Sequence, residues 1–177
     1  MAEFDDYIRV EKLISKFFET VDYCRNSCPD LQTQQDRLIG CCNCGLPVYD
    51  PEEEKKVRAG LYGPYIRSDD ECGYHSDTGC RLKTLKPVGC LSFACNPFHE
   101  YLIQQYGINF RTYSSSNKLY DLDSPTTEIH YLLSKILANK ATPKEIKGLE
   151  RKINMFISIV EKKKPAAFIH SSFQRRP

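Results

Sequence analysis

Residues 71–95 carry the sequence ECGYHSDTGCRLKTLKPVGCLSFAC, which holds four of the nine cysteines of the chain and one of its four histidines. The other five cysteines precede this stretch, and none follows Cys95. Clustered thiols bind soft or borderline metals, as iron–sulfur clusters or as zinc. The sequence therefore predicts a metal–thiolate site in the first half of the chain and a helical scaffold in the second.

The cysteines fall into groups with irregular spacing, Cys-x3-Cys and CCNC upstream and then Cys-x7-Cys-x9-Cys-x4-Cys. Structural zinc sites usually show paired short knuckles, so these spacings favour an iron–sulfur cluster, with Zn²⁺ as the alternative. Adjacent cysteines point in different directions, so either Cys41 or Cys42 ligates while the other packs or serves a second centre. His75 is either a ligand, a donor to a ligating sulfur or a surface residue beside a turn. The candidate metal ligands are Cys24, Cys28, Cys41, Cys42, Cys44, Cys72, Cys80, Cys90 and Cys95.

The cysteine region also resembles a known family. The run Cys72-Gly-Tyr-His, then Gly79-Cys80-Arg-Leu, then Lys86-Pro87-Val-Gly-Cys90-Leu-Ser-Phe-Ala-Cys95 is similar to the second half of the YkgJ-type (CxxCxxCC) zinc- or iron-chelating domains. The resemblance covers about residues 24–98, with the CCNC group in place of the upstream cysteines of the family. It implies metal chelation by the cysteines. Upstream, this chain departs from the compact family pattern, because a gap separates Cys28 from Cys41.

Some relatives in that family are linked to lysine methylation of flagellin. This chain has no glycine-rich loop between a strand and a helix that would cradle a nucleoside cofactor, so we do not expect that reaction here.

Helical periodicity predicts a scaffold around the cysteines. An amphipathic helix over 4–23 has its apolar residues at helical spacing. Asp50-Pro51 should begin a short helix that ends at Gly60, and Asn96-Pro97 should begin one that ends at Gly107. A turn at 76–79 predicts a β-hairpin that brings Cys72 beside Cys80.

The second half should contain a small hairpin over 108–122 and two long helices. Ser124-Pro125 is predicted to begin the first helix, and Thr142-Pro-Lys-Glu145 is a capping box for the second. The two helices should form an antiparallel pair packed on the first helix of the chain.

The predicted fold class is mainly α, with irregular cysteine-rich loops and one or two small β-hairpins, in a single domain organised around the metal–thiolate site. Residues 1–107 would form the N-terminal helix and the metal-binding region. Residues 108–164 would form the hairpin and helical pair, and 165–177 a basic tail.

Composition and charge narrow the expected cellular compartment and the expected binding partners. No stretch suggests a secretory signal or a membrane span, so we expect a cytoplasmic, reducing compartment. The odd number of cysteines argues against a closed set of disulfides. Net charge is +2, yet residues 131–177 hold 11 of the 25 basic and only 3 of the 23 acidic residues. This basic region could bind nucleic acid or an acidic protein, although solvated helix faces explain it more simply.

Three functions compete. The first is an iron–sulfur protein with a role in electron transfer, sensing or protein modification. The second is a structural zinc module whose basic helical half binds a protein or nucleic acid. The third is a thiol enzyme in which His75 or His99 serves Cys72 or Cys95 as a base, and the sequence leaves the question of enzymatic activity open.

Overall fold

The computed structural model describes residues 4–23, 52–64, 75–76, 79–80, 82–111 and 127–163. For residues 53, 75, 76, 79 and 80 it describes the backbone alone. This part of the chain is mainly helical, in agreement with the predicted α class. Its elements are α1 (Asp5–Val21), α4 (Glu52–Tyr62), β1 (His75–Ser76), β2 (Gly79–Cys80), α5 (Val88–Ser92), α6 (Asn96–Tyr106), α7 (Glu128–Leu137) and α8 (Pro143–Lys163).

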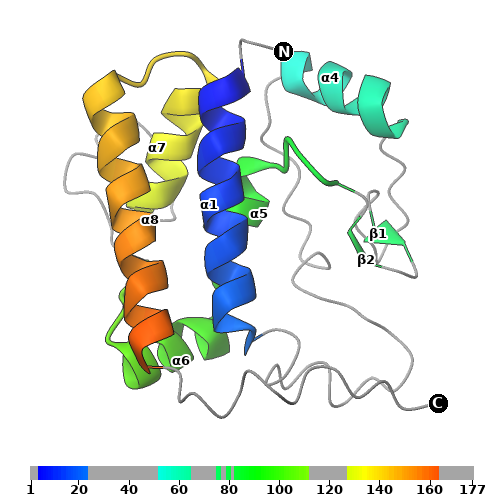
Figure 1. The fold of residues 1–177 in the computed structure, drawn as a ribbon. Coiled ribbons are helices and arrows are strands. Elements are labelled where there is room, and N and C mark those ends of the chain that lie inside the picture. Colours follow the sequence, from blue (N-terminus) through cyan, green and yellow to red (C-terminus); the bar gives the residue numbers. More distant parts are fainter. Residues whose placement is uncertain are drawn as a thin grey trace.

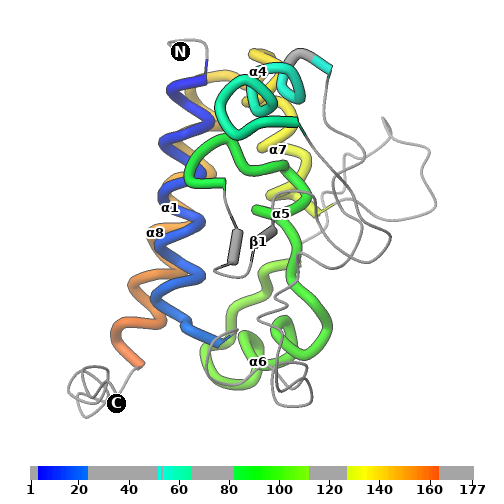
Figure 2. The backbone as a smooth tube through the Cα atoms, turned by 90° about the vertical axis from the view of Figure 1, so that its right-hand side faces the viewer, coloured from blue at the N-terminus to red at the C-terminus, as the bar shows by residue number. Residues whose placement is uncertain are grey.

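The long helices α1 and α8 lie side by side and run in the same direction (Figure 1). Helix α7 runs antiparallel to α8 and also packs on α1, and α6 crosses the lower ends of the bundle (Figure 1). Helix α4 and the β1–β2 strands lie on the side of α1 away from α8, and Figure 2 views the molecule from that side. Of the cysteine-bearing segments, the described residues include the β1–β2 pair, α5 and the start of α6. None of the described helices is long and apolar enough to cross a membrane.

The centre of the core is aromatic. Phe17 of α1 is fully buried and stacks on Phe110, with ring centroids 5.5 Å apart and planes 5° from parallel. Phe156 of α8 meets Phe17 at 5.8 Å, and Phe18 meets Phe98 of α6 at 5.6 Å. Because large buried rings remove much apolar surface from water, this cluster joins α1, α6 and α8 in one core.

Several predicted helix boundaries are confirmed. Helix α1 lies within the predicted 4–23, with its apolar face in the core. Helix α6 begins at Asn96 and stops at Gly107, whose φ of +69° suits glycine. Ile108 and Phe110 are buried, but 110–111 form a turn, and the rest of the predicted 108–122 hairpin lies outside the described residues.

Two predicted boundaries are wrong. Helix α4 does not end at Gly60 but continues to Tyr62, and Gly63, with a φ of +83°, follows it. Gly60 stays helical because nothing in its surroundings requires a left-handed backbone, whereas Gly63 adopts one. Helix α7 has its N-cap at Thr127 rather than Ser124, because the Thr127 side chain accepts a hydrogen bond from the backbone N–H of His130.

The β1–β2 pair is a short antiparallel ladder of two residues a strand, in the region where a hairpin was expected. Its register sets His75 opposite Cys80 and Ser76 opposite Gly79. Cys72, the residue expected beside Cys80, lies outside the described residues.

The capping box of α8 is confirmed. The Glu145 carboxylate accepts hydrogen bonds from the Thr142 backbone N–H (2.7 Å) and hydroxyl (2.9 Å), and the Thr142 hydroxyl oxygen accepts one from the Glu145 N–H (3.3 Å). Lys135 of α7 donates to the same carboxylate at 2.5 Å. These bonds, the one from Lys135 first, lower the pKa of Glu145 to about 2. One side chain thus caps α8 and fastens it to α7.

This network predicts a specific acid sensitivity. The pKa of Glu145 is lower in the folded chain than its ordinary value of about 4.3, so its stabilisation is complete above that pH and is lost as pH falls towards 2. Glu145→Gln should therefore flatten the acid limb of the unfolding free energy measured by denaturant titration. Glu161→Gln, at the exposed end of the same helix, is the control. An acid limb unchanged by Glu145→Gln would contradict the assignment.

Candidate metal centre

The structure describes three of the nine predicted ligand positions. Cys80 lies on β2, Cys90 on α5 and Cys95 at the N-cap of α6. Cys90 and Cys95 are both half-buried. The other six lie outside the described residues and are Cys24, Cys28, Cys41, Cys42, Cys44 and Cys72.

The segment Thr84–Lys86, just before α5, has no regular secondary structure, and side chains satisfy all six of its backbone polar groups. Tyr62 of α4 accepts from the Thr84 N–H (3.0 Å) and contacts the Thr84 carbonyl with its hydroxyl (3.2 Å). Tyr7 of α1 donates to the Lys86 carbonyl at 2.6 Å. Since unsatisfied backbone groups are costly away from water, these side chains determine where the segment lies.

Leu85 is the centre of this arrangement. Its N–H donates to Oε2 of Glu11 at 2.7 Å, and its carbonyl accepts from Nε of Arg58 at 2.5 Å. The second oxygen of Glu11 accepts from the Lys86 N–H at 3.1 Å. Leu85 itself has a φ of +56°, a left-handed backbone that costs a non-glycine residue about 1–3 kcal/mol. The hydrogen bonds and the burial of its side chain offset this strain.

Both charged groups in this clamp are buried. Glu11 and Arg58 are each 2% exposed, and the guanidinium of Arg58 also lies 3.5 Å from the carboxylate of Glu54. Burial raises the pKa of Glu11, against the effect of the Lys86 and Leu85 amides and the charges of Lys86 and Arg58. Burying these charged groups is costly unless they are hydrogen-bonded. Here the Glu11 carboxylate accepts from the backbone N–H groups of the irregular segment, and the Arg58 guanidinium donates to its carbonyl.

The clamp leads directly into the helix that carries Cys90. Pro87 is the N-cap of α5, and its carbonyl accepts from the Cys90 N–H at 2.9 Å. Val88 and Leu91 anchor α5 in the core, and Ser92 donates to the Val88 carbonyl while lying 3.0 Å from Nδ1 of His130 on α7. The position of Cys90 along the bundle is thus set from both ends of a five-residue helix.

Arg111 binds the residues on both sides of Cys95. Its Nε donates to the Ala94 carbonyl at 2.8 Å, its Nη2 donates to the same oxygen, and its Nη1 donates to the Asn96 side chain at 2.6 Å. Cys95 precedes the first turn of α6, where backbone N–H groups give the helix a partial positive charge. In general, a helix N-terminus is a position that favours a thiolate over a thiol.

The histidines take different roles. His99 of α6 makes a hydrogen bond to Asn109 through Nε2 at 3.1 Å. His75 lies opposite Cys80 in the β1–β2 ladder, so the register sets a possible nitrogen ligand next to a possible sulfur ligand. Within the part of the chain that the structure describes, no group of three or more histidine, cysteine or acidic side chains is close enough to hold a metal.

Comparison with protein-family models, with curated proteins and with solved structures finds no match to this chain. The resemblance to YkgJ-type domains therefore stays a prediction. The described residues define a helical scaffold in which Cys90 and Cys95 are half-buried and Cys95 lies at a helix N-terminus.

The residues that position the described cysteines were not predicted from the sequence. Glu11 lies on the apolar face of the first helix, between Val10 and Ile14, and a carboxylate at such a position is a usable signal of a buried polar contact. Arg58 and Arg111 gave no such signal, because their partners are backbone carbonyls distant in sequence.

The Glu11 clamp can be tested by removing its acceptors in steps. Glu11→Ala leaves the Leu85 and Lys86 amides without their acceptor and should lower the free energy of unfolding by about 1–3 kcal/mol. Glu11→Gln keeps one carbonyl oxygen and should lose less. Glu19→Ala, at an exposed position of the same helix, should change little. Equal unfolding free energies for all three variants would refute the clamp.

Proposed function

We propose that this chain is a cysteine-cluster metal-binding protein that carries an iron–sulfur cluster, with a role in electron transfer, sensing or protein modification. The observation that carries the proposal is the concentration of all nine cysteines before residue 96, in groups with irregular spacing. Thiolate ligands require a reduced compartment, which favours the cytoplasm. The resemblance to YkgJ-type chelating domains supports the same chemistry.

The surroundings of the described cysteines are compatible with this proposal. Cys95 lies at a helix N-cap beside the guanidinium of Arg111, and Cys90 follows a segment whose backbone is fully hydrogen-bonded. A cluster held by such residues would have a rigid ligand framework on this side. Cys95 also packs against the buried hydrophobic core, which limits the access of water.

The described N-terminal segment ends at Tyr23, which packs against α6. Tyr23, the residue before Cys24 in sequence, packs its ring against Phe98 (5.3 Å) and Tyr101 (4.7 Å) of α6, the helix that begins after Cys95. Because Cys24 follows Tyr23 in the sequence, this contact supports a site that combines cysteines from both groups.

A structural zinc module is the alternative, and two observations favour it. His75 lies opposite Cys80 in the ladder, as a nitrogen and a sulfur ligand of a zinc site would. Cys41 and Cys44 are separated by two residues, the spacing of one zinc knuckle. Under this alternative the metal stabilises the fold, and the basic helical half binds a partner.

Purification without oxygen, followed by elemental analysis and a visible spectrum, distinguishes the two. An iron–sulfur protein should be brown and contain iron and acid-labile sulfide, and Cys90→Ser or Cys95→Ser should reduce both. Ile103→Ser, at an exposed position of α6, is the control. Colourless, iron-free protein with bound zinc that unfolds in chelator would favour the zinc module instead. Folded protein with no metal would exclude both.

Arg111 offers a second test of the same centre. Arg111→Ala should release the Ala94 carbonyl and the Asn96 side chain beside Cys95 and weaken metal retention about 10- to 100-fold in a chelator competition, as removal of a supporting residue commonly does. Arg111→Lys keeps the charge but not the fork-shaped hydrogen bonding, and should also weaken retention. Arg9→Ala removes two ion pairs elsewhere on the bundle, those with Asp6 and Glu150, and should have no effect on metal retention. Retention unchanged in both Arg111 variants would contradict this role.

A further inference from the structure

Charges on α8 are sorted between two faces. Of its three glutamates, Glu145 bonds to Lys135 and Thr142, and Glu150 pairs with Arg9 of α1 at 2.5 Å. The ammonium of Lys152 pairs in turn with Glu128 of α7. These interactions fasten α8 to its neighbours. They also engage the two carboxylates near its N-terminal half, so those carboxylates are not available to the outer face.

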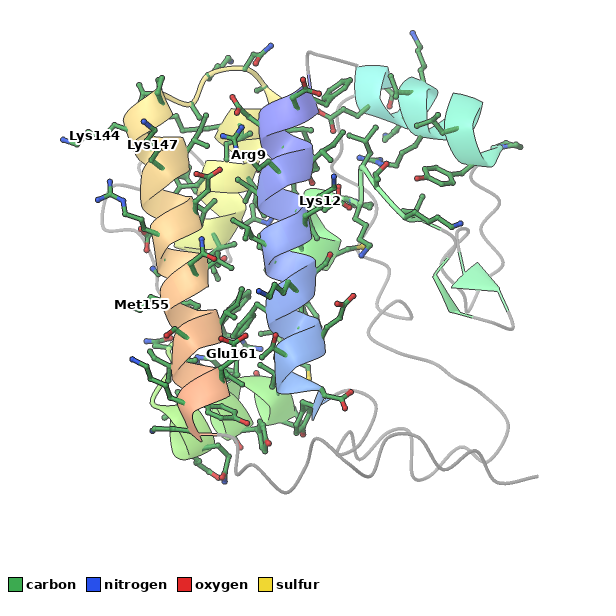
Figure 3. The ribbon with its side chains drawn as sticks, viewed as in Figure 1. Arg9, Lys12, Lys144, Lys147, Met155 and Glu161 are labelled. Carbon is green, nitrogen blue, oxygen red and sulfur yellow. The ribbon has the colours of Figure 1, made fainter. Side chains whose placement is uncertain are left out.

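The charged residues on the outer face of the same half of α8 are all cations. Lys144, Lys147 and Arg151 are exposed, and none of the three makes an ion pair with another described residue. They lie at i, i+3 and i+7 on one side of the helix, over about 10 Å of its axis. Figure 3 shows Lys144 and Lys147 extending outward from the upper part of α8, with Met155 and Glu161 further down.

One further cation lies at this end, because Lys140 is exposed in the turn that precedes α8. Glu161, the third glutamate of the helix, lies about 15 Å beyond Arg151 along the axis. We name the four cations Lys140, Lys144, Lys147 and Arg151 the α8 cationic stripe.

The side-chain types in the stripe indicate which kind of polyanion it fits best. It contains no large apolar side chain, and Met155, 52% exposed, follows only after Arg151. Helices that bind membrane surfaces alternate basic with apolar residues, and protein interfaces use aromatic anchors. Single-stranded nucleic acid needs aromatic rings on which bases stack. A row of cations without these features suits the phosphates of a duplex.

We propose that the α8 cationic stripe binds the phosphate backbone of duplex nucleic acid without reading its sequence. Lysine and arginine side chains neutralise phosphates and release counterions, so affinity should fall linearly with salt on logarithmic axes. The stripe lies on α8 and the turn before it, and neither contains a cysteine. This proposal therefore does not depend on the metal centre.

Fluorescence anisotropy of the full chain with two labelled DNA duplexes of unrelated sequence, between about 50 and 200 mM salt, tests the proposal. Both duplexes should bind with similar affinity. The triple variant Lys144→Gln, Lys147→Gln and Arg151→Gln should reduce the slope of log affinity against log salt by about 2–3, close to one for each cation removed. Circular dichroism establishes that the variant is folded.

The matched control is Lys16→Gln, Lys56→Gln and Lys83→Gln, which removes the same charge from exposed positions outside α8. It should leave the slope unchanged. Equal reductions of the slope in the two triple variants would show that net charge alone drives binding and would overturn the proposal. So would absence of duplex binding by the unaltered chain, or stripe-dependent binding to phosphatidylserine vesicles or polyglutamate in place of the duplex.

Discussion

The hydrogen-bonded clamp around Leu85 is the constraint on which the arrangement of this molecule depends. A non-glycine residue with a left-handed backbone, buried between two helices, is stable only when both of its peptide groups find partners. Glu11 supplies the acceptor and Arg58 the donor. Because these side chains come from α1 and α4, one set of hydrogen bonds orients α4, the irregular segment and α5 against the bundle.

The clamp also decides how the cysteine region relates to the helical half. Cys90 follows it within one turn of α5, and Cys95 is held a few residues later by Arg111. The aromatic contacts of Tyr23 fasten the end of the described N-terminal segment to α6. Of the predicted ligand positions, Cys90 and Cys95 thus rest on a core built from apolar packing.

Sequence patterns predicted the structure correctly where residues close in sequence determine it. The apolar periodicity of α1, the stop of α6 at Gly107 and the capping box of α8 all depend on residues within one or two turns. The same signals failed at Gly60, because a glycine permits a helix end without requiring one. They failed again at Ser124, where a later threonine provides the cap.

The sequence by itself determined that the scaffold is helical and that many thiol groups are present, because apolar spacing and cysteine content are properties of the chain. It could not assign partners to Glu11, Arg58 or Arg111, whose hydrogen bonds reach backbone groups 17 to 75 positions away. Only the tertiary structure decided that these charged residues are buried or bound to backbone and position Cys90 and Cys95. The physical reason is that an irregular backbone takes its hydrogen-bond partners from whichever side chains the packed helices bring beside it.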